Sequence, residues 1–209
     1  MADESRAPGT GASLDGVRIV SLDVRWNTGA QTALGDRIGI AAMPLVRDRV
    51  ESREHVVHSN QPATPDETTR LGISDGVVEV DLAAAPADVE RIVVLAFVQP
   101  RANAPKRTLD EVSSLDVSVR DDATGREITR SGNLASAAGP VSALVVAEVV
   151  RGDAGWRVEF TGRGYDKGRS TLQCAAWALV AEPLQRSVLC PPRVRTRILR
   201  AFGAQIGEG

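Results

Sequence analysis

The chain has 209 residues, of which 43% are hydrophobic, 25% charged and 3% aromatic, a content that suits one folded domain with extensions and excludes a fully disordered chain. Its 25 Lys and Arg nearly balance 27 Asp and Glu, which argues against the strongly basic surface of a general nucleic-acid binder. Cys174 and Cys190 have no nearby histidine or second cysteine pair, so they predict no zinc site and fit a reduced, cytoplasmic protein.

The N-terminal residues 1–14 are small and acidic and predict a disordered tail. A secretory signal would instead place basic residues before an apolar stretch. The longest apolar run, Cys174 to Ala181, is too short to cross a bilayer. We therefore expect a soluble or peripheral protein of the cytoplasm.

Strand patterns dominate the chain from residue 15 to residue 170. Apolar and polar residues alternate from Val17 to Trp26, which predicts a strand with Val20, Leu22, Val24 and Trp26 on its core face. Alternating or continuously apolar runs predict further strands at 37–46, 77–82, 91–98, 112–120, 141–150 and 155–160.

The connections between these runs indicate how the strands are joined. Asp and Gly at 121–127 and 151–155 are typical of hairpins, and 60–69 reads as a long loop at one end of the domain, where binding residues often lie. Helical periodicity is scarce, with short candidates at 86–90 and near Leu109. Without alternating helices, the pattern predicts an all-β fold, an antiparallel two-sheet β-sandwich with short helices.

The pattern changes in the C-terminal extension, residues 171–209. Pro191 and Pro192 precede a predicted helix at 193–206, whose apolar stripe is formed by Val194, Ile198, Phe202 and Ile206. Such a helix could dock on another subunit, lie on an anionic membrane surface or cover the protein's own sheet, and the sequence leaves these three alternatives open.

Two glycine motifs resemble catalytic or cofactor signatures. Gly72 to Gly76 spells G-x-S-x-G around Ser74, but a predicted strand follows it, where a hydrolase needs a helix, and both histidines precede it. We therefore predict a glycine-bounded loop. Gly162 to Gly168 resembles a dinucleotide fingerprint with a displaced third glycine and no surrounding βαβ unit, so we predict a tight turn there.

Oxygen-bearing side chains in predicted loops are the one plausible metal chemistry. Asp36, Asn60, Asp66, Glu67 and Asp75 all lie in or beside loops between strands. Hard cations such as Ca²⁺ take six to eight oxygens from such groups. Ordinary solvated turn acids explain the pattern equally well.

Four segments resemble the TerD-type tellurium-resistance and stress-protein domain. They are GDRIGIAA (35–42), VVEVDLAAAPADVERIVVLAFV (77–98), DVSVRDDATGREI (116–128) and ALVVAEVVRGDAGWRVEFTGRGY (143–165), of which the second and fourth are the most specific. The resemblance covers residues 17–168. It implies a β-sandwich of cytoplasmic bacterial stress proteins that is linked to tellurite resistance, is not known as an enzyme fold, and often binds Ca²⁺ through acidic loops.

The chain departs from the family's calcium-binding pattern at each part. The early aspartate pair becomes Asp36-Arg37-Ile38, the asparagine pair becomes Ser59-Asn60, and the acidic loop shortens to 65–76. Asp36, Asn60, Asp66 and Asp75 are the metal ligands that the resemblance still implies. Loss of a carboxylate and gain of a cation weaken such a site, so we expect either no cofactor or weak Ca²⁺ binding.

The sequence thus predicts a non-enzymatic stress-response or tellurium-resistance module with degenerate calcium sites. It is expected to act through protein partners, other tellurium-resistance proteins among them, without nucleic acid, and with peripheral membrane association left open. The alternative is a residual Ca²⁺-binding stress protein that uses its acidic loops.

Overall fold

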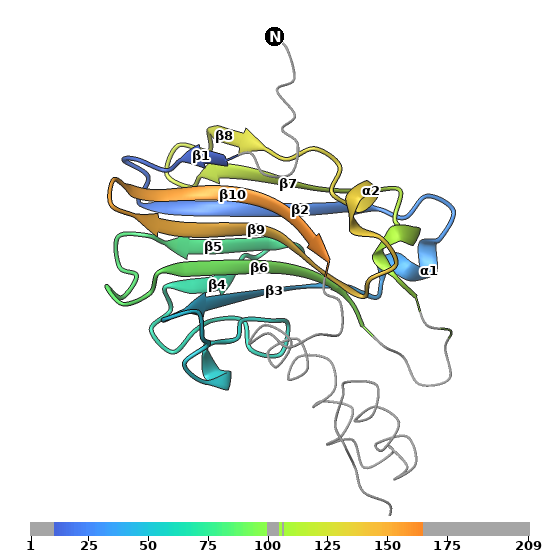
Figure 1. Cartoon of the computed structure of the whole chain (residues 1–209), viewed down its shortest axis with the longest axis horizontal. Helices are drawn as coiled ribbons and strands as arrows, with labels where there is room; N and C mark the ends of the chain where they lie inside the picture. The colour runs from blue at the N-terminus through green and yellow to red at the C-terminus, as the bar shows by residue number, and fades with distance from the viewer. Residues whose placement is uncertain (1–10, 100–104, 106, 165–209) are drawn as a thin grey trace, which may run out of the picture. The chain divides into compact units, whose positions relative to one another are not determined.

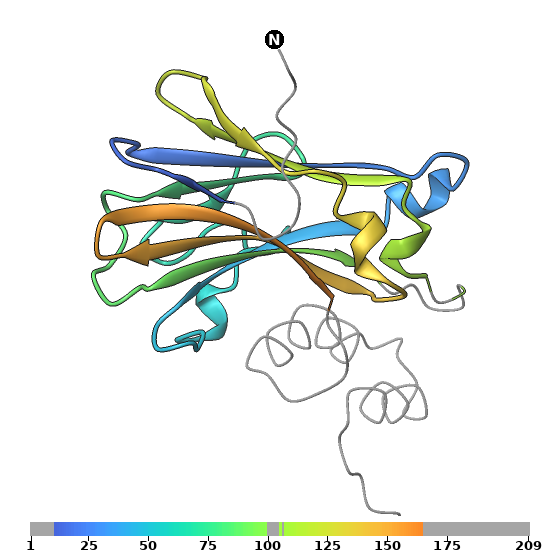
Figure 2. The same cartoon turned by 45° about the horizontal axis from the view of Figure 1, so that its top comes forward.

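Ten strands form two antiparallel sheets in the computed structural model, which describes residues 11–99, 105 and 107–164. The first sheet has the order β1-β10-β9-β6-β3 and the second the order β4-β5-β2-β7-β8. Figure 1 labels the elements, and Figure 2 shows the sheets as two layers. The strands are β1 (Gly11–Ser13), β2 (Ile19–Asn27), β3 (Ile38–Leu45), β4 (Thr69–Leu71), β5 (Val77–Asp81), β6 (Arg91–Val98), β7 (Ser114–Asp121), β8 (Glu127–Arg130), β9 (Ala143–Gly152) and β10 (Gly155–Gly164). The predicted antiparallel β-sandwich is confirmed.

Helical structure in the described residues is limited to single turns between strands. These are α1 (Thr32–Gly35), α2 (Ala135–Ala138), and the 3₁₀ turns η1 (Arg53–His55) and η2 (Leu109–Glu111). A capping box formed by Thr108 and Glu111 caps the N-terminus of η2. No helix among the described residues has the length and apolar character needed to cross a membrane.

The interior of the sandwich follows from strand alternation. Val20, Leu22 and Val24 of β2 are buried in the core as predicted, and Trp26 packs against it half-buried. They meet inward-facing residues of the first sheet, such as Ile92 and Phe160. The outward positions of β2 therefore carry the polar residues of that segment.

The first sheet is apolar on both faces. Strands β3, β6 and β9 are buried along almost their whole length, and one set of alternate residues joins the interior cluster. The other set faces away from the second sheet and forms what we call the outer apolar face: Ala41, Met43, Val93, Leu95, Phe97 and Val145. Antiparallel sheets with one solvated face show polar residues at such positions.

The second sheet carries charge on its outward face. Arg70 of β4 pairs with Glu79 of β5 at 2.7 Å, and Asp23 pairs with Arg25 along β2 at 2.8 Å. Glu127, at the start of β8, pairs with Arg130 at the end of that strand. The two sheets thus differ in the chemistry that they present outward.

Several local predictions are wrong at the edges of elements. Residues 11–14 belong to the sandwich and not to a disordered tail, because β1 pairs with β10 and Leu14 is only 2% exposed. Gly162 lies in a β-bulge inside β10, with a φ of 59°, and the strand continues to Gly164, so no tight turn is formed at 162–164. The rest of the predicted turn, 165–168, lies outside the described residues. The segment 86–90 is a turn rather than a helix.

The seven predicted strands are all confirmed as β2, β3, β5, β6, β7, β9 and β10. The short edge strands β1, β4 and β8 were not predicted. The predicted helix at 193–206 and both cysteines lie outside the described residues.

Candidate functional site

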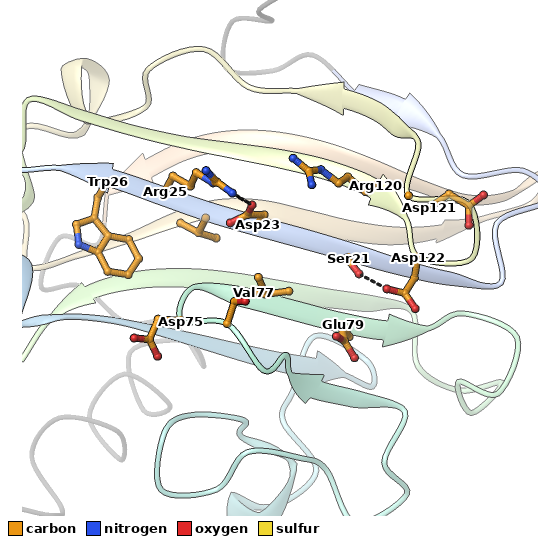
Figure 3. A pocket seen from close by; sticks show the side chains of 13 residues that line it. Ser21, Asp23, Arg25, Trp26, Asp75, Val77, Glu79, Arg120, Asp121 and Asp122 are labelled. Carbon is orange, nitrogen blue, oxygen red and sulfur yellow. Dashed lines mark hydrogen bonds and ion pairs between the residues drawn. The ribbon is translucent and has the colours of Figure 1, made fainter.

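A hollow of ≈ 630 Å³ lies on the outward face of the second sheet, across strands β5, β2 and β7. Because Val20, Leu22 and Val24 point inward, the intervening residues of β2 point into this hollow. Figure 3 shows the side chains that line it. They are Ser21, Asp23, Val24, Arg25, Trp26, Ser74, Asp75, Val77, Glu79, Arg120, Asp121, Asp122 and Gly125.

Negative charge predominates in the hollow. Its lining holds five carboxylates and two guanidinium groups. Asp23 forms a hydrogen-bonded ion pair with Arg25, and this hydrogen bond and the charge of Asp23 raise the pKa of Arg25. Asp122 accepts a hydrogen bond from the Ser21 hydroxyl at 3.1 Å. The hollow is therefore suited to a ligand that carries positive charge.

Two charged side chains of the hollow are available for new contacts. Among the described residues, none forms a hydrogen bond or salt bridge with the side chain of Asp75 or of Arg120. Asp75 lies near Trp26 at one end of the hollow, and Asp121 and Asp122 lie at the other (Figure 3). An indole ring beside carboxylates is a combination that can hold an arginine or lysine side chain.

The G-x-S-x-G motif forms the hairpin between β4 and β5. The amide of Gly72 donates to the carbonyl of Val77 at 2.9 Å, and β5 begins directly after Gly76. This confirms the predicted glycine-bounded loop followed by a strand. Gly76 has a φ of 87°, and a Cβ there would lie 2.4 Å from the carbonyl oxygen of Val24. Glycine is therefore required at this position by the packing of the hairpin on β2.

The four predicted metal ligands lie on four different connections. Asp36 directly follows α1, Asn60 lies in a turn closed by His58 and Gln61, Asp66 precedes β4, and Asp75 lies in the β4–β5 hairpin. Of these residues, Asp75 alone lines the hollow. Within residues 11–99, 105 and 107–164, no three His, Cys, Asp or Glu side chains are placed together so that they could hold a metal ion.

Asp66 has a structural role in its own loop. Its Oδ1 accepts hydrogen bonds from the Thr64 hydroxyl at 2.5 Å, the Thr68 amide at 3.2 Å and the Thr68 hydroxyl at 3.0 Å. Burial alone would raise the pKa of Asp66, but these hydrogen bonds outweigh it and lower the pKa. The carboxylate thereby orders the turn that leads into β4.

Arg37, which directly follows Asp36, is also used by the fold. The residue is buried, and its guanidinium donates to the carbonyl oxygens of Gln99 at 3.1 Å and Pro105 at 3.3 Å. It therefore holds the connection that follows β6. The position next to Asp36 thus carries a fixed cation.

Most residues of the hollow were not predicted from the sequence, because they lie in strands and the predicted oxygen ligands lie in loops. Asp23, Arg25, Glu79 and Arg120 lie within strands, at outward positions of β2, β5 and β7. Alternation along each strand predicts that they face outward. It does not predict that β2 lies between β5 and β7, and this neighbourhood creates the hollow.

Comparisons with known proteins identify the family of the chain. The TerD domain model matches residues 9–174, which include the whole described sandwich. A solved homologue of telluride resistance protein (TerD) from Streptomyces coelicolor A3(2) is 23% identical, with 77% of this chain and 96% of that chain covered and a TM-score of 0.54. The solved protein SAV2460 is 21% identical, with 76% and 98% covered and a TM-score of 0.53. Both structures share the fold, and because the family match spans most of its length, the chain belongs to the TerD domain family.

Proposed function

We propose that this chain is a non-enzymatic stress-response module of the tellurium-resistance type, which acts in the bacterial cytoplasm by binding a protein partner. The hollow on the second sheet is the observation that carries the proposal. Carboxylates from β2, β5 and the β7–β8 turn line it, and Trp26 lies at one end. The partner that fits this surface presents a basic segment, whose arginine or lysine side chains would contact Asp75 and Asp122.

The rigidity of the surface favours recognition of a partner. Asp23, Arg25 and Glu79 project from paired strands, whose β2–β5 and β2–β7 registers are continuous along the hollow. Asp75 and Asp122 lie in the turns of the β4–β5 and β7–β8 hairpins. Ordered carboxylates lose little further freedom when a basic partner binds, which lowers the entropic cost of association. Other tellurium-resistance proteins are the partners that family membership suggests.

Charge reversal in the full chain tests the proposal. The double variant Asp75→Lys/Asp122→Lys is expected to lose proteins that the wild type captures from a lysate of the native host, and the wild-type capture is expected to weaken as salt rises. Asp153→Lys is the matched control, because Asp153 is exposed in the β9–β10 hairpin of the other sheet. Capture of the same proteins by the double variant would contradict the proposed surface.

A growth assay links that surface to the stress response. In a host that lacks its own copy of this gene, the wild type and Asp153→Lys are expected to restore growth under tellurite, and the double variant is not. Restoration of growth by all three proteins would contradict a role of the hollow in the stress response.

The proposal that the chain is not an enzyme rests on the role of the G-x-S-x-G segment. Gly76 is required by packing, and Ser74 lies in a strand-to-strand hairpin, away from the strand-to-helix turn that exposes a hydrolase nucleophile. A fluorophosphonate probe is expected to leave Ser74 unlabelled. Labelling that disappears in Ser74→Ala would overturn this part of the proposal.

The proposal treats the calcium sites as degenerate. Asp36, Asn60 and Asp66 are not among the residues that line the hollow with Asp75, and Asp66 Oδ1 already accepts three hydrogen bonds. A residual Ca²⁺-binding stress protein remains the alternative function, since carboxylate oxygens are the ligands that Ca²⁺ prefers. The melting experiment described in the Discussion separates the two.

A further inference from the structure

The five carboxylates of the hollow are not equally free to bind a partner. Four of them already have a polar partner within the domain, and these pairs are Asp23 with Arg25, Glu79 with Arg70, Asp121 with Thr124, and Asp122 with Ser21. Among the described residues, none forms a hydrogen bond or salt bridge with Asp75. Because a new contact with a paired carboxylate must compete with its present partner, an incoming cation gains most at Asp75.

Asp75 lies close in the chain to the only large apolar side chain that is exposed among the described residues. Ile73 precedes it by two residues in the β4–β5 hairpin, and its exposed fraction is 107%. Single exposed apolar residues are common on protein surfaces, so Ile73 gains meaning only from its neighbours. Here the neighbours are a free carboxylate and, at the same end of the hollow, an aromatic ring.

The aromatic ring is that of Trp26, which packs against the same hairpin. A Cβ on Gly76 would lie 3.2 Å from Cζ3 of the ring, and Figure 3 shows the ring at the end of the hollow where Asp75 lies. The ring is only partly buried, and no described residue accepts a hydrogen bond from its N–H. An indole face beside a free carboxylate attracts a cation, and its N–H can donate to a backbone carbonyl of a partner.

The hairpin fixes the backbone of this group before any partner binds. The amide of Gly72 donates to the carbonyl of Val77 at 2.9 Å, and the amide of Val77 donates to the carbonyl of Ser74 at 3.3 Å. The amide of Val24 donates to the carbonyl of Gly76 at 2.9 Å, which ties the hairpin to β2. Such preorganisation lowers the entropic cost of association.

We propose that Ile73, Asp75 and Trp26 form the binding hot spot for the protein partner, which presents an apolar residue close to an arginine or lysine. The inference rests on the proposed function and deepens it, because it states which part of the hollow selects the partner. The cation contacts Asp75 and the ring of Trp26, and the apolar residue covers Ile73. The paired carboxylates act at the rim through longer-range attraction.

The spacing and the charges of the surface define the partner further. Asp75 lies two residues after Ile73, at most about 7 Å along the chain, and residues i and i+2 on one face of an extended segment have this spacing. Arg120 also has no hydrogen bond or salt bridge among the described residues, so its guanidinium repels additional cations in the hollow. The surface therefore favours one basic residue with an apolar neighbour over a polybasic run.

Titration of the full ¹⁵N-labelled chain with blocked tripeptides tests the proposal, because the amide signals report where each peptide binds. Acetyl-Leu-Ser-Arg-amide is expected to shift the signals of Ile73, Asp75 and the indole N–H of Trp26. It should bind about tenfold more tightly than acetyl-Gly-Ser-Arg-amide, since only leucine covers an apolar side chain. Acetyl-Arg-Ser-Arg-amide should also bind more weakly than the leucine peptide.

Three exposed substitutions separate the contributions to the hot spot. Ile73→Ser is expected to remove the advantage of the leucine peptide over the glycine peptide, and Asp75→Asn to weaken the binding of both severalfold. Asp122→Asn is the matched control and should change each affinity by less than twofold, because Asp122 is already paired with Ser21.

Failure of this inference can be distinguished from failure of the proposed function. Shifts centred on Asp121 and Asp122, no shifts at Ile73, Asp75 and Trp26, or equal binding of the leucine and glycine peptides would each overturn the hot spot. Equal effects of Asp75→Asn and Asp122→Asn would do the same. The charge-reversal experiment described above would still decide whether the hollow binds a partner. Self-association that Ile73→Ser abolishes would assign the group to a second copy of the chain and also overturn the inference.

Discussion

The guanidinium of Arg151 lies over the ring of Trp156, 4.3 Å from the ring centroid, and the two residues are paired across the β9–β10 hairpin. Arg151 also donates hydrogen bonds to the carbonyl oxygens of Val89, Ala85 and Pro86. The indole nitrogen of Trp156 donates to the carbonyl of Leu82 at 3.2 Å. The pair therefore fastens the connection from β5 to β6 onto the hairpin.

This contact explains why two distant segments carry the family resemblance. One segment, 77–98, supplies the carbonyl groups, and the other, 143–165, supplies the arginine and tryptophan. Since β5 belongs to the second sheet and β6 to the first, the connection between them crosses from layer to layer. The two motifs therefore contact each other through Arg151 and Trp156, and we call this pair with the carbonyl groups that it binds the clamp.

Removal of the clamp is expected to destabilise the fold. Arg151→Ala leaves three carbonyl groups without their donor and removes a cation–π contact, which should lower the free energy of unfolding by about 2–4 kcal/mol in urea titrations. Arg157→Ala serves as the control, because Arg157 is exposed on the adjacent strand, and should change it by less than about 0.5 kcal/mol. Equal effects of the two variants would contradict a clamp.

Two glycines with positive φ should respond differently to alanine. Gly76 has a φ of 87° and faces the Val24 carbonyl, whereas Gly125 has a φ of 69° and open space around it. Gly125→Ala should cost about 1 kcal/mol, the left-handed backbone penalty alone. Gly76→Ala should lower the free energy of unfolding by at least about 1 kcal/mol more than Gly125→Ala does, because β2 and the hairpin must also move apart. Thermal melts of both variants measure this difference, and equal costs would contradict the close packing.

Calcium is expected to leave the stability of the protein unchanged. A ligand present at one hundred times its dissociation constant stabilises a fold by about 2.7 kcal/mol. Melting curves in millimolar CaCl₂ and in excess chelator should therefore superimpose if the sites are degenerate. A higher midpoint in CaCl₂ that Asp75→Asn or Asp36→Asn abolishes would instead support the calcium-binding alternative.

The pH dependence of stability should report on the Asp66 turn. Hydrogen bonds from Thr64 and Thr68 lower the pKa of Asp66 in the folded state below that of the unfolded chain. The stabilisation is therefore present above the unfolded pKa, about 3.9, and is lost as pH falls through the folded pKa. The difference in unfolding free energy between wild type and Asp66→Asn should be constant near neutral pH and shrink below about pH 4. A difference that grows on acidification would contradict the turn geometry.

The fold was largely predictable because its long strands carry strong patterns. β2 alternates cleanly, and β3, β6 and β9 are apolar and buried along almost their whole length. The strands β4 and β8 escaped prediction since three or four residues, Arg70 or Glu127 among them, are too few to show a period. Their strand character comes from pairing with β5 and β7, which is a tertiary effect.

The candidate site was less predictable than the fold. Asp75 was singled out as a loop acid, but its neighbours in the hollow, Asp23 and Arg120, come from strands far apart in the chain. Strand order decides which outward residues meet, and no local pattern encodes that order. The sequence likewise shows Arg151 only as part of a motif. Its hydrogen bonds to the carbonyl oxygens of Val89 and Ala85 depend on the tertiary structure.

The pairing of β1 with β10 constrains how the protein is made. Gly11 lies opposite Glu159, so β1 is synthesised well before the strand with which it pairs. At typical translation speeds this interval is roughly 7–30 s, during which the apolar β3 and β6 are already outside the ribosomal tunnel. We therefore expect the first sheet to stay incomplete, with β1 unpaired, until β10 has been synthesised.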